Sequence, residues 1–255
     1  MKSATPTEPE IDAVVIDTCV MSQGRLNIVN LQGLAARLEN LSIPLWVPTQ
    51  VVWEWAAHEA QDARSHASLT RRLRIAGIDD DKALSSPWSG FQGDIGKIAA
   101  DFATRLHDRI DAIPNITILP LVGESAIAGL RDQVLGTGPG TTKGKDGDQV
   151  RTGGVDSAWV RDAVAHTAAV AHTQRKVPYG LVFFTDNRSD VVKTLAEMGF
   201  RPSDVRVCGP TESDLFALIA RARPADGAIR MAVAGYFESQ ATDERSATTW
   251  AASVV

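Results

Sequence analysis

The stretch AVVIDTCVM, residues 13–21, joins a short apolar run to a carboxylate, Asp17. Uninterrupted apolar runs of this length are typical of strands that are buried on both faces of a parallel sheet. The aspartate that ends the run can be a local cap for the following turn, or the first member of a charged site. The residues that follow the other strands decide between these two interpretations.

Comparable apolar runs recur along the chain, and segments with helical spacing lie between most of them. The further runs are residues 43–47, 116–121, 181–184 and 205–208. The helical segments include 26–38, 48–74 and 95–113. This alternation predicts an α/β fold, a three-layer α/β/α sandwich with a mostly parallel central sheet.

The flanks and one internal segment differ in composition from the predicted sandwich. We expect a flexible N-terminus over residues 1–10, one domain over 11–222, and a C-terminal helical extension and tail over 223–255. The extension carries an apolar stripe at helical spacing, formed by Ile229, Ala232, Val233, Tyr236 and Phe237. Residues 136–154 are rich in glycine and in charges of both signs, which predicts a mobile loop without regular structure.

The composition excludes several classes of protein. The chain has 255 residues, of which 44% are hydrophobic, and a net charge of -5, as in ordinary globular proteins. Two cysteines do not make a disulfide framework. Residues 1–10 lack the apolar core of a signal peptide and no later stretch is apolar for long enough to cross a bilayer, so we expect a cytoplasmic protein without a membrane partner.

Acidic residues occur where the predicted strands end. Asp17 and Asp186 each follow a strand directly, and the carboxyl ends of parallel strands meet at one edge of a sheet. Glu54, in PTQVVWEW, follows the second strand and has the apolar neighbours Val51, Val52 and Trp55. An exposed glutamate that stabilises the first turns of a helix is the alternative for Glu54.

Two further acids open predicted helices. Asp156, in GGVDSAWVRDAVAH, shares a helical face with Trp159, Val160 and Ala163, which directs its carboxylate inward. Asp162 lies on another side of that helix, where we expect it to be solvated or paired locally. Asp190, four residues after Asp186, is either a supporting ligand or an ordinary helix-start residue.

A set of acids without adjacent histidines or cysteines suits a hard cation such as Mg²⁺ or Mn²⁺. Carboxylates gathered at one point repel each other unless a cation neutralises them. Three polar neighbours of the strand ends, Thr18, Thr185 and Asn187, can orient ligands or water there. The alternative for these three residues is hydrogen bonding within their own turns.

The order of AVVIDTCVM, PTQVVWEW, GGVDSAWVRDAV and FFTDNRSDV resembles PIN-domain nucleases over roughly residues 11–209. The resemblance implies that Asp17, Glu54, Asp156 and Asp186 bind Mg²⁺ or Mn²⁺ and hydrolyse RNA phosphodiester bonds, leaving a 5′-phosphate and a 3′-hydroxyl. The chain is longer than the compact toxin-type members, with insertions around residues 62–113 and 136–152. The resemblance therefore leaves open a toxin-like role, an inhibitory antitoxin-like partner and a homodimer.

Basic and aromatic residues near these motifs are candidates for RNA contacts. Lys143, Lys145 and Arg151 lie in the segment that leads to Asp156, and a second basic group is Arg71, Arg72 and Arg74. Trp88 and Phe91 can stack on bases or pack against the core. The alternative for both basic groups is a solvated surface, which is the commoner role of a basic cluster.

Two other functions compete with a nuclease. A phosphatase of the haloacid dehalogenase type also begins with a strand that ends in an aspartate, but its signature resembles Asp-x-Asp-x-Thr, and Cys19 occupies the second acidic position here. The other alternative is a catalytically silent PIN-like fold that binds RNA or a protein. Acids at all four matching positions argue against that silent fold.

Overall fold

The computed structural model describes residues 11–21, 24–75, 95–136, 139, 142–143, 150–151, 153–170, 180–201 and 206–222. The predicted N-terminal and C-terminal segments, 1–10 and 223–255, lie outside the described residues. Lys145, Trp88 and Phe91 lie outside them as well. Among the described helices, none combines the length and the apolar character needed to span a bilayer.

A five-stranded parallel sheet forms the centre of the molecule. Its strands are β1 (Ala13–Ile16), β2 (Leu45–Pro48), β3 (Ile116–Leu119), β6 (Leu181–Phe184) and β7 (Arg206–Cys208). They lie in the order β3-β2-β1-β6-β7, and every neighbouring pair is parallel. All five strands fall within the apolar runs predicted from the sequence, with boundaries that differ by at most two residues, apart from Pro48 at the end of β2.

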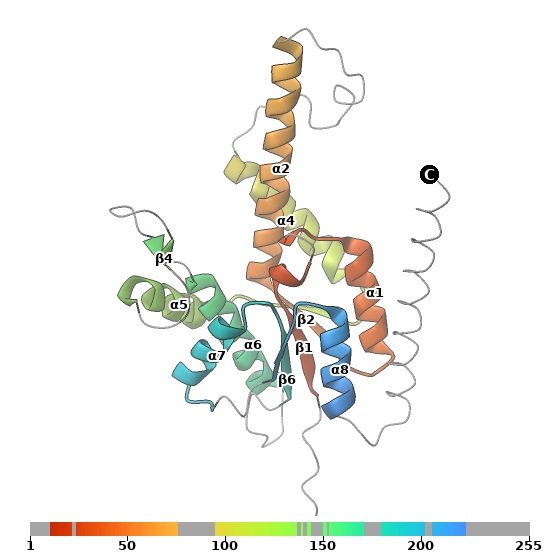
Figure 1. The fold of residues 1–255 in the computed structure, drawn as a ribbon, viewed down its shortest axis with the longest axis vertical. Coiled ribbons are helices and arrows are strands. Elements are labelled where there is room, and N and C mark those ends of the chain that lie inside the picture. The colour runs from red at the N-terminus through yellow and green to blue at the C-terminus, as the bar shows by residue number, and fades with distance from the viewer. Residues whose placement is uncertain are drawn as a thin grey trace, which may run out of the picture.

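Helices cover both faces of the sheet, as Figure 1 shows. One face packs against α1 (Ile28–Glu39), α2 (Thr49–Ile75), α4 (Ile95–Asp111) and α8 (Glu212–Ala222). The other face packs against α6 (Gly154–Val170) and α7 (Arg188–Glu197). The predicted three-layer α/β/α sandwich is confirmed.

Alternating side chains of the strands divide the core into two layers. Val14 and Ile16 of β1 point to the α1 side and pack with Trp55 of α2. Val15 points to the opposite side and packs with Trp159 of α6. β1, β2 and β6 are buried on both faces, which is the physical reason that their sequences are uninterrupted apolar runs, whereas the edge strand β3 has an exposed residue, Thr117.

The chain reverses its direction of travel across the sheet between β1 and β6. From β1 it proceeds to β2 and β3 on one side, and it then returns to form β6 and β7 on the other side. A crevice opens at such a point because the connections from the two strands leave in opposite directions. Asp17 follows β1 and Thr185 follows β6, so both residues lie at this point of the sheet.

Helix α5 (Gly123–Leu135) packs on α6 at the outer side of the sandwich. Gly129 permits the close approach, since a Cβ at this position would stand 2.2 Å from the carbonyl oxygen of Gly154. The buried carboxylate of Asp132 accepts hydrogen bonds from Ser157 (2.7 Å) and Arg161 (3.1 Å) of α6. Close backbone packing and buried hydrogen bonds therefore hold α5 to the domain.

The prediction of a loop without regular structure over residues 136–154 is wrong in one respect. Two short strands, β4 (Thr142–Lys143) and β5 (Val150–Arg151), form an antiparallel pair within this segment. Two-residue strands are too short to show an alternating pattern in the sequence, which is why the prediction missed them.

Candidate functional site

Asp17 is a buried hydrogen-bond acceptor at the end of β1, with 2% of its surface exposed. Its Oδ1 atom accepts from the backbone N–H of Thr18 at 2.6 Å, which makes Asp17 the N-cap of the 3₁₀ turn Thr18–Val20. Its Oδ2 atom accepts from the hydroxyl of Thr185 at 2.6 Å and from the thiol of Cys19 at 3.0 Å. Asp17 is therefore both a cap and the centre of a polar cluster that joins β1 to β6.

The hydroxyl of Thr18 connects Asp17 to Glu54. It lies 2.7 Å from Oε2 of Glu54 and 3.2 Å from Oδ1 of Asp17. A hydroxyl has one proton, so it can donate to only one of the two carboxylates at a time. Burial and the nearby charge of Asp17 raise the pKa of Glu54, whereas the hydrogen bond from Thr18 opposes the rise.

The charges of three other acids act on Asp156. Its pKa is raised to about 7, first by burial and then by the charges of Asp17 and Glu54, with a smaller contribution from Asp190. The indole N–H of Trp159, one turn along α6, lies 3.4 Å from Oδ1 of Asp156 and opposes this rise. Acids from β1, α2, α6 and α7 thus share one electrostatic environment.

The two acids after β6 are placed differently. The residue Asp186 is exposed, and its backbone N–H donates to the sulfur of Cys19 at 3.0 Å. Asp190 is half-buried in the first turn of α7, and its charge acts on Asp156. The predicted role of Asp186 as a ligand stays a prediction, while Asp190 already belongs to the electrostatic cluster.

The remaining polar candidates support Asp17. Thr185 is buried, and its hydroxyl accepts from the backbone N–H of Asn187 at 2.9 Å while it donates to Asp17. The side-chain amide of Asn187 approaches Oδ2 of Asp17 at 3.5 Å. The same hydrogen bonds therefore shape the turn after β6 and orient the carboxylate of Asp17, and the predicted role of these residues in orienting a metal ligand or water stays a prediction.

The chemistry of the cluster suits a hard cation. All of its charged groups are oxygen acids, and burial together with their mutual repulsion raises the pKa values of Glu54 and Asp156. Within the described part of the chain, no three acidic, histidine or cysteine side chains converge closely enough to hold a metal ion. Mg²⁺ does not require such convergence, because it keeps several waters and binds through one or two carboxylates.

Asp162 is not solvated, contrary to the prediction. It is 1% exposed and accepts from the side-chain amide of Gln50 at 2.6 Å and from the backbone N–H of Val122 at 3.1 Å. Val122 is the N-cap of α5, so this carboxylate ties the starts of α2 and α5 to α6. Its partners are distant in sequence, and for that reason the local pattern gave no sign of them.

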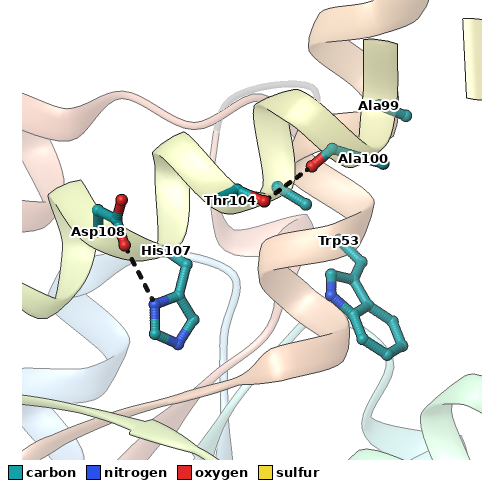
Figure 2. Close-up of a pocket in the computed structure, with 7 residues that line it drawn as sticks. Trp53, Ala99, Ala100, Thr104, His107 and Asp108 are labelled. Carbon is teal, nitrogen blue, oxygen red and sulfur yellow. Dashed lines mark hydrogen bonds and ion pairs between the residues drawn. The ribbon is translucent and has the colours of Figure 1, made fainter. Parts of the chain in front are cut away.

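A groove lies between α2 and α4, next to Trp53, the residue that precedes Glu54. Its volume is about 530 Å³, and it is lined by Trp53, Ala99, Ala100, Ala103, Thr104, His107 and Asp108. Figure 2 shows the rings of Trp53 and His107 directed to the same side of the groove. The indole of Trp53 is 49% exposed, which is unusual for so large an apolar side chain.

The exposed position of Trp53 was not predicted, although the sequence contains a signal for it. Val51, Val52 and Trp55 form the buried stripe at the start of α2, and Trp53 falls outside that stripe. A tryptophan on the solvent side of a helix beside a candidate acid is a feature of binding surfaces. The spacing of the neighbouring residues therefore indicated an exposed ring.

Comparison of the chain with protein-family models, with curated proteins and with solved structures finds no match. The chemistry of the site must therefore be inferred from its own residues. Among the predicted substrate contacts, Lys143 and Arg151 lie on β4 and β5, and Arg71, Arg72 and Arg74 lie on the last turns of α2. Their predicted contacts with RNA stay predictions.

The raised pKa of Asp156 makes the stability of the metal-free protein depend on pH. Between about pH 4 and pH 7 the folded carboxyl keeps a proton that the unfolded chain has lost. This contribution to stability is complete below pH 4 and is lost as the pH rises through about 7. We expect Asp156→Asn to abolish this pH dependence. The free energy of unfolding of the variant, relative to that of the wild type, should therefore rise by about 2 kcal/mol from pH 5 to pH 8.

Urea unfolding of the wild type and of Asp156→Asn, in EDTA at about pH 5 and about pH 8, measures this difference. Parallel pH dependence in wild type and variant would contradict the raised pKa of Asp156.

Proposed function

We propose that this protein is a Mg²⁺- or Mn²⁺-dependent endoribonuclease of the PIN-like type. The observation that carries the proposal is the coupling of Asp17, Glu54 and Asp156 at the point where the chain reverses across a parallel sheet. Such a point is the usual ligand site of an open α/β sheet. A group of carboxylates at that place favours a cation and an anionic substrate that binds through it.

The residues of the cluster would have different roles in binding the cation. Glu54, Asp156 and Asp190 would hold a hydrated cation together with Asp17, which the hydroxyl of Thr185 and the thiol of Cys19 keep in one orientation. When bound, the cation lowers the pKa of a water and neutralises charge that develops on the scissile phosphate. The exposed Asp186 would complete the ligand set after a small movement of its turn.

Trp53 extends the proposed site towards the bases of the substrate. It directly precedes Glu54 on α2, and it is half-exposed and lines the groove together with Ala99, Ala100 and Ala103 of α4. An exposed indole stacks on any base, because every base has a π-face. A base next to the scissile phosphate would therefore lie on Trp53 while the phosphate faces the carboxylates.

Cleavage of single-stranded and structured RNAs with Mg²⁺, Mn²⁺ or EDTA tests the function. We expect cleavage that depends on the metal, is lost in EDTA and leaves 5′-phosphate ends. Cleavage that continues in EDTA contradicts the proposal. RNA binding without cleavage favours a silent binding module, and hydrolysis of a small phosphomonoester without RNA cleavage favours a phosphatase.

Substitution of Trp53 tests the base-stacking surface. We expect Trp53→Ala to raise KM for a short single-stranded RNA roughly 10-fold with a smaller change in kcat, because one base–aromatic stack contributes about 1–3 kcal/mol. Trp53→Phe should keep part of the effect, since a smaller ring still stacks. Steady-state kinetics on both variants provides the measurement, and unchanged KM in Trp53→Ala would exclude this surface.

A further inference from the structure

Helix α5 carries large apolar side chains on the face that points away from the domain. Ile127, Leu130, Val134 and Leu135 are 70%, 62%, 72% and 65% exposed. Scattered exposed apolar residues are normal, but four on one face of a 13-residue helix form a continuous stripe. We call these four residues the α5 stripe.

The helical geometry of α5 separates the stripe from its buried face. Ser125, Gly129 and Asp132 are buried against α6, and the stripe occupies the opposite side of the helix, with Ile127 at its centre. Gly129 fixes this orientation, since its close contact with Gly154 leaves no room for α5 to rotate. The apolar stripe therefore cannot turn into the core.

Charged residues on the same face are arranged symmetrically about Ile127. The exposed Glu124 lies in the first turn of α5, and Arg131 lies two turns further on. The Arg131 side chain is 62% exposed and also lies 3.5 Å from the buried carboxylate of Asp132 in its own chain. Both lie the same number of positions from the midpoint between Ile127 and Ala128. Leu121, directly before the N-cap and 40% exposed, lies as far from that midpoint on one side as Val134 on the other.

We propose that the α5 stripe is a homodimer interface, in which α5 pairs antiparallel with α5 of a second copy. A two-fold axis near Ile127 brings Glu124 of each copy opposite Arg131 of the other and Leu121 opposite Val134. An isologous contact requires a surface that is complementary to itself, and this distribution of charged and apolar residues has that property. Antiparallel helices also place the opposite ends of their dipoles together.

This interface is independent of the proposed nuclease activity, because it is formed by the outer face of α5 and contains none of the clustered acids. Its test is likewise independent of RNA cleavage. Sedimentation of the full chain measures the dimer directly.

We expect the wild type to sediment as a dimer at micromolar concentration and Ile127→Asp to raise the dimer dissociation constant by at least about 100-fold. Val29→Asp is the matched control, since Val29 is an equally exposed apolar residue (69%) on α1, on the opposite face of the sheet. Circular dichroism and thermal unfolding verify that each variant is folded. A wild type that is monomeric up to about 100 µM, or a folded Ile127→Asp variant that dimerises like the wild type, overturns the proposal.

Charge reversal tests the antiparallel register. Glu124→Arg and Arg131→Glu each place like charges opposite one another in their own homodimer, so each should weaken its dimer about 3- to 10-fold. Arg131→Glu also removes the ion pair with the buried Asp132, so circular dichroism first verifies that this variant is folded. In a mixed dimer of the two variants, the introduced arginine faces the introduced glutamate, and the native Arg131 of one copy faces the native Glu124 of the other. Opposite charges then meet in both halves of the interface, so the mixture should form heterodimers preferentially. Native mass spectrometry resolves the three dimers, and a statistical mixture of them contradicts the register and with it the proposed interface.

Discussion

Replacement of Asp17 by asparagine is expected to reduce metal-dependent RNA cleavage by roughly 1,000-fold, about 4 kcal/mol of transition-state stabilisation. Asp17 belongs to the carboxylate cluster and is held by the hydroxyl of Thr185 and the thiol of Cys19. The asparagine oxygen can still accept from the backbone N–H of Thr18. Its amide nitrogen, however, donates where the carboxylate accepts, so the charge and the orientation of the ligand change together.

The fold should survive this substitution, because two opposing effects act on stability. Hydrogen bonds to a charged acceptor are lost, while repulsion of Glu54 and Asp156 is relieved. The loss of the Asp17 charge should also lower the pKa of Asp156, which a carboxyl-carbon NMR titration measures independently of activity.

Asp162→Asn provides a matched control for Asp17→Asn. Asp162 is as deeply buried as Asp17, but its partners are Gln50 and the backbone of Val122, and it does not contribute to the raised pKa of Asp156. We expect Asp162→Asn to lower thermal stability and to leave the activity per folded molecule unchanged. Full activity in a folded Asp17→Asn variant would remove Asp17 from the proposed site.

Enlargement of Gly129 is expected to destabilise the fold by about 2–4 kcal/mol, since an added methyl group would overlap backbone. The Cβ of Gly129→Ala would stand 2.2 Å from the carbonyl oxygen of Gly154 and 3.2 Å from the Cβ of Ala158. Neither contact can be relieved by a side-chain rotation, so α5 must move away from α6. The movement would also stretch the hydrogen bond from Ser157 to Asp132.

Gly123→Ala is the control for this effect. Gly123 lies at the first position of the same helix, and a Cβ there would have nothing within 4 Å. Because alanine favours the helix over glycine, we expect Gly123→Ala to be neutral or to stabilise by up to about 1 kcal/mol. Urea unfolding of the two variants should therefore give changes of opposite sign, and equal stabilities would contradict the tight packing of α5 on α6.

The positions of Asp17, Glu54 and Asp156 could be predicted because they depend on local patterns. A strand buried on both faces produces an apolar run, and the residue after that run lies at the edge of the sheet. The helix stripe around Val51 and Trp55 likewise places Glu54 near this edge. Short-range spacing was sufficient for these parts of the site.

Other features depend on partners that are distant in the chain. Asp186 and Asp190 are one helical turn apart, and which of them acts on Asp156 depends on where α7 begins and how it packs on α6. Asp162 is buried because Gln50 and Val122 supply donors from two other helices. The groove beside Trp53 exists because α4 presents alanines there. Each of these contacts joins segments that are far apart in the chain, and no local sequence pattern shows that they are neighbours in space.

The thiol of Cys19 gives the carboxylate cluster an uncharged partner that resists chemical modification. Burial, followed by the charge of Asp17, raises its pKa to about 11, so almost no thiolate exists at neutral pH. The thiolate is the form that alkylating reagents and peroxide attack, and a protonated thiol is correspondingly inert. Cys19 can therefore donate to Asp17 without adding a further negative charge, and the site should tolerate oxidising conditions that inactivate enzymes with an exposed, ionised cysteine.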